Sequence, residues 1–399
     1  MIRSARLALL LLLLAATSGA AQLPIIRGYY QNVPLWSDST EFANGGFSDF
    51  NRLRLMTEPS FGRFSTQIAY EQFLSLTQRP KQVFNPAAGA LLPSGGEWLD
   101  LQWTIKETDH VTWGHRFDRL NIRWQPNQIL DVTVGRQAIS WATTLLLTPA
   151  DPFSPFNPSD PFREYRAGVD AARVQVYTGP FTDFDVVARP TKNNTLTGTE
   201  VEELTVLGRG RTVWNTWEVS AWLGMIYDEP GMAISTAGSL GAFAIRGEAS
   251  LRELEDEVVI RATIDIDRLF RLLGRDFYVV LEYQHDGFGA SSPEGYTDVV
   301  ISAPFARGEL QVLGQDELVG QASWQVHPLW NTSLLLLWNL NDGSAQLVPG
   351  ASYSLSNEVR LQGGVFFGFG DSTSTVATPI PSEYGISPTT VYVALNAFF

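Results

Sequence analysis

The sequence predicts an all-β protein: a transmembrane antiparallel up-and-down β-barrel of about 16–18 strands, forming one domain after a cleaved signal peptide. Three observations predict this fold. Apolar and polar residues alternate with a period of two along most of the chain. The alternating segments run for about 9 to 12 residues, which suits a tilted membrane crossing. Short connections alternate with long ones that are rich in Gly, Pro and Ser.

Composition limits the function classes. The 399 residues include no cysteine, so disulfides, thiolate metal sites, iron–sulfur clusters and cysteine nucleophiles are excluded. The formal net charge of −14 argues against nucleic-acid binding through a basic surface. The four histidines have no metal-ligand spacing, and no GxSxG nucleophile elbow is present. We therefore expect neither an enzyme nor a metal or other cofactor.

Residues 1–21 have the organisation of a secretory signal peptide. Arg3 and Arg6 precede a short apolar run from Leu7 to Ala16, and small residues follow. Cleavage is expected after Ala20 or Ala21, which leaves residues 22–399 for the barrel. An uncleaved anchor is the alternative. No later segment has the roughly 20 apolar residues of a membrane-spanning helix.

The strands follow from the alternation. In EVVIRATIDID the even positions Val258, Ile260 and Ile264 are apolar, whereas Arg261 and Asp265 at odd positions are polar. A soluble β-sandwich would produce the same alternation, but the strand lengths and the order of short and long connections favour a barrel. The expected strands are a segment near residue 25, then 48–57, 62–74, 113–124, 129–138, 168–177, 182–190, 200–209, 213–226, 230–241, 242–251, 257–267, 276–286, 310–327, 330–340, 345–355, 358–369 and 389–399. Residues 97–112 could add a hairpin within a loop.

The side chains expected to face the lumen can be assigned from the same alternation. They are Arg52, Arg54, Arg119, Arg123, Asp131, Arg246, Glu248, Arg261, Asp265, Asp267, Glu282 and Arg360. One interpretation is a wet wall whose opposite charges pair across neighbouring strands. The other is a transverse field, with arginines on one wall and carboxylates on the other. The sequence does not place strands around a circumference, so both stay open.

One segment cannot belong to the wall. LTPADPFSPFNPSDPFREYRAG has proline at every third position from Pro149 to Pro161, and proline cannot donate to a strand ladder. The spacing matches polyproline II, which would carry separate proline, phenylalanine and polar stripes. We expect residues 141–167 to fold into the barrel as a constriction, with the phenylalanines against the wall and the polar stripe toward the lumen. A rigid external loop and a polyproline ligand for a partner protein are the alternatives.

The candidates for pore or constriction residues lie in this loop and at the strands that flank it. They are Arg136, Asp151, Ser154, Asn157, Asp160, Arg163, Glu164, Arg166 and Arg173. The chain ends in TTVYVALNAFF, an alternating strand that closes on Phe399 and resembles the assembly signal of bacterial outer-membrane proteins.

The run VGRQAISWATTLLLTPADPFSPFNPSDPFREYRAGVDAARV resembles a segment of bacterial outer-membrane porin-type barrels, and more loosely of alginate-export-type barrels. The resemblance covers about a tenth of the chain strongly. It implies a passive or diffusion-facilitating channel and does not carry a substrate. We expect small polar solutes or oligosaccharides to diffuse through it, in the outer membrane of a diderm bacterium. The expected partners are outer-membrane lipids, the β-barrel assembly machinery and the solute. A monomer and a trimer of this chain both stay open. The alternative is a scaffolding barrel that its proline-rich loop closes and that serves a partner complex.

Overall fold

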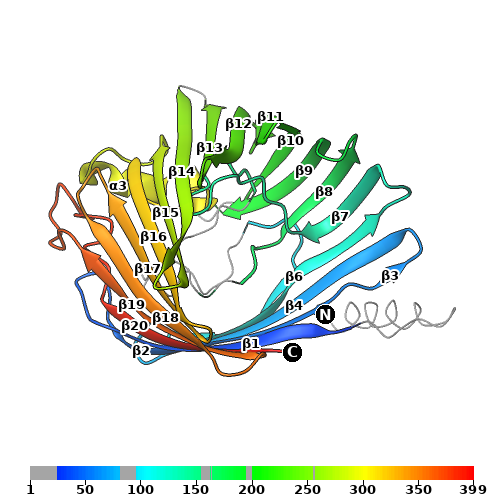
Figure 1. Cartoon of the computed structure of the whole chain (residues 1–399). Helices are drawn as coiled ribbons and strands as arrows, with labels where there is room; N and C mark the ends of the chain where they lie inside the picture. Colours follow the sequence, from blue (N-terminus) through cyan, green and yellow to red (C-terminus); the bar gives the residue numbers. More distant parts are fainter. Residues whose placement is uncertain (1–24, 81–95, 154–161, 163, 195–199, 255–256) are drawn as a thin grey trace.

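The structure is a computed structural model that describes residues 25–80, 96–153, 162, 164–194, 200–254 and 257–399. The predicted signal peptide therefore lies outside the described residues. Within them the protein is a closed antiparallel β-barrel (Figure 1). None of the helices found there has the length and apolar character that a membrane-crossing helix needs.

Eighteen strands form the wall. They are β1 (Arg27–Ser37), β2 (Gly46–Thr57), β4 (Phe64–Thr77), β6 (Val111–Trp124), β7 (Leu130–Gln137), β8 (Val169–Tyr177), β9 (Asp183–Asn194), β10 (Glu200–Trp214), β11 (Trp217–Ile226), β12 (Glu229–Leu240), β13 (Phe243–Glu253), β14 (Val258–Leu272), β15 (Arg275–Asp286), β16 (Asp316–His327), β17 (Trp330–Asn339), β18 (Ala345–Ser354), β19 (Val359–Phe369) and β20 (Thr390–Phe398). The remaining elements are β3 (Ser60–Phe61), β5 (Gln102–Thr108), the 3-10 helix η1 (Pro293–Gly295), α3 (Tyr296–Ile301) and α4 (Ala303–Ala306).

Each wall strand pairs with its neighbours in the sequence, and β1 pairs with β20 to close the barrel. The prediction of 16 or 18 strands is confirmed at the higher number, and every expected strand has its counterpart. Strand β5 pairs with the first half of β6, which is the hairpin expected within residues 97–112. Closure leaves no free sheet edge, which a barrel in a membrane requires because lipid cannot bond to exposed backbone groups.

The two ends of the barrel differ, as Figure 1 shows. Ile25, the C-terminus and most of the short turns, such as Asn215–Thr216 and Leu273–Gly274, lie at one end. The described parts of the long connections 38–45, 78–101, 138–168, 287–315 and 370–389 begin and end at the other end. We call this the loop end. Since consecutive antiparallel strands reverse direction, an even strand number places the two termini together.

The alternation sorts the side chains between the two faces of the wall. On β14, Ile260 and Ile264 are more than half exposed on the outer face, whereas Arg261 and Asp265 are buried on the inner face. The same pattern repeats around the barrel because side chains of a strand point alternately to its two faces. The outer face is therefore mainly apolar, and the inner face carries most of the charge.

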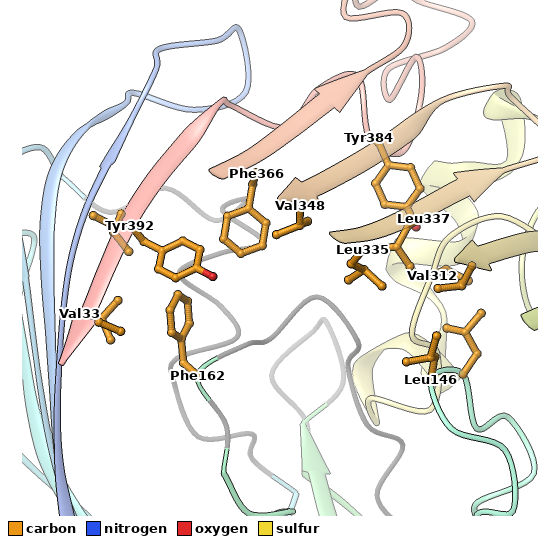
Figure 2. Packing of buried hydrophobic residues seen from close by; sticks show 14 of the residues in the cluster. Val33, Leu146, Phe162, Val312, Leu335, Leu337, Val348, Phe366, Tyr384 and Tyr392 are labelled. Carbon is orange, nitrogen blue, oxygen red and sulfur yellow. The ribbon is translucent and has the colours of Figure 1, made fainter. Parts of the chain in front are cut away.

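A hydrophobic cluster also lies inside the barrel at its loop end (Figure 2). Leu146, Phe162, Val312 and Tyr384 come from three of the long connections. They pack against inward-facing wall residues, which include Val33, Leu335, Leu337, Val348, Phe366 and Tyr392. These three connections are thus not a loose cover over the barrel, since part of each is buried within it.

Candidate functional site

The connection between β7 and β8, residues 138–168, enters the barrel. We call it the inward loop. Its first part reaches strands β9 and β11: Trp141 Nε1 donates to Asp185 at 3.0 Å, and Trp222 Nε1 donates to the carbonyl of Ala150 at 3.1 Å. Trp141 and Phe153 are both buried and meet edge to face at 4.9 Å between ring centroids. The described part of the loop therefore packs against the inner wall.

Two wall carboxylates hold the loop by its main chain. Glu248 on β13 accepts from the N–H groups of Thr143 and Ala150, at 2.9 and 3.2 Å, and from that of Thr144. Glu282 on β15 accepts from three consecutive N–H groups, those of Leu145, Leu146 and Leu147. Both carboxylates are buried. Because main-chain N–H groups are obligatory donors, these contacts satisfy a stretch of loop that forms no strand ladder.

The last part of the loop reaches the opposite wall. The side-chain amide of Gln31 on β1 donates to the carbonyl of Phe162 at 3.1 Å, and the Phe162 ring meets Tyr392 of β20 edge to face at 4.8 Å (Figure 2). Glu164 pairs with Arg360 of β19 at 2.6 Å. The described part of the inward loop before residue 154 and the part from Phe162 onward are thus attached to different sides of the barrel wall.

The local conformation differs from the prediction. The described residues at the start of the proline repeat do not continue a polyproline helix, because Asp151 N–H donates to the Thr148 carbonyl at 3.0 Å and closes a turn. The Asp151 side chain is also buried rather than lumen-facing. Its carboxylate accepts from Ser140 Oγ at 2.8 Å and pairs with Arg166 at 3.0 Å. Of the polar stripe, Ser154, Asn157 and Asp160 lie outside the described residues, as does Arg163.

The two arginines on the flanking strands lie in different places. Arg136 shares a strand face with the exposed Val134, pairs with Asp170 at 2.7 Å and donates to the Leu99 carbonyl at 2.8 Å. It therefore fastens the segment before β5 to the wall and is not part of the inward loop. Arg173 is on the inner face of β8, where it pairs with Asp185 at 2.6 Å.

Most of the remaining lumen candidates form ion pairs, several of them across neighbouring strands. Arg54 pairs with Asp118 at 2.7 Å, and its guanidinium lies over the Tyr165 ring of the inward loop, 4.7 Å from the centroid. Arg52 is buried on the same strand and lies over the Phe50 ring. The other pairs are Arg119–Asp118, Arg123–Asp131, Arg246–Asp265, Arg246–Asp267 and Arg261–Asp286.

The inner face of the wall has a charged part and a mostly neutral part. Within the charged part, arginines and carboxylates are not separated from each other. Arginines and carboxylates alternate on the inner faces from β2 to β14. On β16 to β20 the inward residues include Gln321, Ser333, Ser352, Gln362 and Asn396. In that described part of the wall, Glu317 and Arg360 are the inward charges within the strands. Of the two interpretations of the sequence, the structure thus has pairing across neighbouring strands.

Sequence reasoning missed Asp118, which joins Arg54 and Arg119. The register of β4 with β6 shifts between Ala69 and Tyr70, and this bulge lets Asp118 and Arg119 both bond within the lumen. A strict alternation would have placed them on opposite faces. Nothing in the local sequence marks the bulge, since it depends on the pairing of two strands.

A second missed group lies between the connections 287–315 and 370–389. Glu383 accepts from the N–H groups of Leu313 and Gly314, at 2.7 and 3.0 Å, and from the Asn339 side chain at 2.8 Å. Burial raises the pKa of Glu383 to about 7, although these hydrogen bonds oppose the shift. Tyr384 is buried beside it, donates to Glu317 at 2.7 Å and has its pKa raised by burial. No spacing in the sequence connects these residues.

Comparisons with known proteins agree on the fold. No family model matches the chain, and no curated protein matches it. Among solved structures, a BenF-like porin from Pseudomonas fluorescens Pf-5 is similar, with a TM-score of 0.56 and 11% identity over 96% of this chain and 100% of that one. OccAB4 of Acinetobacter baumannii has a TM-score of 0.55 and 9% identity over 95% and 99% of the two chains. OccK2 of Pseudomonas aeruginosa, in complex with glucuronate, has a TM-score of 0.53 and 11% identity over 96% and 99%.

Proposed function

We propose that this protein is a porin-type channel of the outer membrane of a diderm bacterium, through which small polar solutes diffuse. The observation that carries the proposal is an inward loop attached to different sides of the wall of a barrel of eighteen strands. Barrels of 16–18 strands are wide enough to hold an aqueous path, and a loop inside the lumen narrows that path.

The paired wall supports a path for polar rather than apolar solutes. Neighbouring arginines and carboxylates keep the inner face hydrated, and the strands opposite present amides and hydroxyls. A solute that gives up part of its hydration shell finds both donors and acceptors there. One of the similar structures, from Pseudomonas fluorescens Pf-5, is a BenF-like porin by its printed description, and another holds glucuronate, a small polar solute; both agree with this function. The looser resemblance to alginate-export-type barrels stays a prediction.

Insertion into the membrane is part of the proposal. The apolar outer face suits lipid, and Phe399 pairs its N–H with the carbonyl of Gly28 at 2.9 Å where the barrel closes. We propose that Phe399 is read by the β-barrel assembly machinery and that the loop end faces outward. A scaffolding barrel with a closed lumen is the competing function, because the inward loop could fill the remaining space.

Conductance in a planar bilayer separates the two functions. Purified protein, first shown to be folded by a heat-modifiable shift in gel mobility, should produce stable unitary current steps. A folded barrel that inserts but carries no current would overturn the channel proposal and favour the scaffold. Liposome swelling with neutral sugars of increasing size then measures the diameter of the path.

A further inference from the structure

Arg268 on β14 is a cation on the outer face of the barrel. It lies two residues after the outward-facing Ile266, toward the end of the barrel opposite the loop end, which we call the turn end. Val279 of β15 is its partner in the strand register. The guanidinium carbon lies 4.8 Å from the centroid of the Phe243 ring and 4.7 Å from that of Phe270. These two rings are 36% and 38% exposed, so they hold the guanidinium at the outer surface.

Arg268 has no anionic partner in the part of the chain that the structure describes. No carboxylate there forms an ion pair with it, and its Nε is buried without a hydrogen-bond acceptor. Arginines on the inner face of the same strands differ, because Arg246 pairs with Asp265 and Arg261 pairs with Asp286. The two phenyl rings attract the cation, but a guanidinium has five N–H donors and a ring offers them no oxygen. An anion from outside the chain would satisfy these donors.

The depth of Arg268 identifies the source of that anion. With about 3.3 Å per residue and a tilt of about 40°, strand Val258–Leu272 spans about 35 Å of the membrane normal. An apolar band about 25 Å tall, centred on the strand, then has its border near Phe270, where an aromatic residue is expected. The Arg268 backbone lies about 5 Å inside this border, and its side chain extends back toward the Phe270 ring. The guanidinium is thus at the level of the lipid headgroups, where the phosphates lie.

We propose that Arg268 binds the phosphodiester of a phospholipid in the leaflet at the turn end. The planar guanidinium fork matches two phosphate oxygens, and Phe243 and Phe270 shield the contact from water. With the loop end facing outward, this leaflet is the periplasmic one, which consists of phospholipids. The acidic side chains Asp49 and Asp316 of the outer face lie near the loop end, so they do not repel a phosphate bound at the turn end. Phosphatidylglycerol is the preferred headgroup, because it has no ammonium group to compete with the guanidinium for the phosphate.

The inference rests on the proposed placement in the outer membrane, and a lipid titration of the purified barrel tests it separately. The folded protein is freed of lipid in detergent, titrated with phosphatidylglycerol and analysed by native mass spectrometry. Arg268→Leu removes the proposed phosphate ligand. The matched control is Arg271→Leu, which removes the same charge from the inner face of the same strand, where Arg271 is exposed and lies 3.5 Å from Asp276. The heat-modifiable gel shift shows that each variant is folded, and Arg268→Gln replaces Arg268→Leu if the leucine variant does not fold.

We expect the wild-type protein and Arg271→Leu to bind one phosphatidylglycerol with a dissociation constant at least tenfold lower than that of Arg268→Leu. Diacylglycerol, which has no phosphate, should bind all three proteins equally. Equal binding of phosphatidylglycerol by the wild-type protein and Arg268→Leu, an equal loss in Arg271→Leu, or tighter wild-type binding of lipopolysaccharide than of phosphatidylglycerol would each overturn the proposal. Absence of the protein from isolated outer membranes would instead contradict the proposed function.

Discussion

Glu282 Oε2 accepts a hydrogen bond from the main-chain N–H of Leu146 at 3.1 Å, although 136 residues separate them in the sequence. This contact is one of several by which carboxylates of the inner wall bind the main chain of the inward loop. Wall carboxylates hold the first part of the inward loop through its backbone. The position of the first part of the loop therefore depends on Glu248 and Glu282 as well as on the buried loop side chains Trp141 and Phe153.

Replacing both carboxylates should release the first part of the inward loop. Hydrogen bonds to a charged group contribute about 1.5–3 kcal/mol each, so Glu248→Ala with Glu282→Ala should destabilise the docked loop by at least about 3 kcal/mol. We expect larger and noisier unitary currents. The matched control is Glu218→Ala, which removes an inward carboxylate on β11 that pairs with Arg211. Equal conductance in all three proteins would show that the loop is held by other contacts.

The far end of the loop should depend on Phe162. This side chain is 2% exposed against Tyr392, and Phe→Ala changes at buried sites cost about 3–5 kcal/mol. Phe162→Ala should expose the peptide bond after Arg166 to trypsin added to reconstituted protein, whereas Phe181→Ala, in an exposed turn, should not. Resistance of the Phe162→Ala variant would mean that the Gln31 and Arg360 contacts suffice.

Breaking one ion pair of the charged wall should change both stability and ion preference. Asp185 accepts from Arg173 and from the Trp141 indole. Asp185→Asn leaves Arg173 without its buried partner charge. Removing one partner of a buried ion pair lowers the free energy of unfolding by about 3–5 kcal/mol. We expect a lower urea midpoint and a reversal potential shifted toward anions in a salt gradient. The double variant with Arg173→Gln should restore the wild-type reversal potential.

The contact between the long connections 287–315 and 370–389 should weaken as pH rises. The pKa of Glu383 is raised to about 7 from an ordinary value near 4.5, so the folded state binds the proton more tightly. Stability is then greatest below pH about 4.5, falls as pH rises to about 7 and is constant above, with a total change of roughly 3 kcal/mol. Hydrogen exchange of residues 309–315, corrected for intrinsic rates, should be faster at pH 8 than at pH 5.

The Glu383→Gln variant is the control for this dependence. Glutamine has no proton to lose in this range, so exchange at residues 309–315 should have the same corrected rate at both pH values. If the wild-type and variant proteins respond equally to pH, another group controls the opening of these connections.

The wall was predictable because its signal is local. Whether Arg261 or Ile260 faces the lumen follows from neighbours one residue away, and a period of two persists along each strand. The same reasoning assigned Glu282 to the inner face and excluded the proline repeat from the wall. It failed at Asp118, where a bulge set by the pairing of β4 with β6 interrupts the alternation.

The sequence by itself determined the barrel, the strand faces and the wall residues, since each depends on neighbours along one strand. Only the tertiary structure decided what those side chains bind. Glu282 meets Leu146, and Phe162 meets Tyr392, only once the barrel has closed and brought distant strands around one lumen. The turn at Thr148–Asp151 replaced the expected polyproline start because Asp151 is buried against Ser140 and Arg166. Contacts across a closed barrel depend on its circumference, which no local pattern encodes.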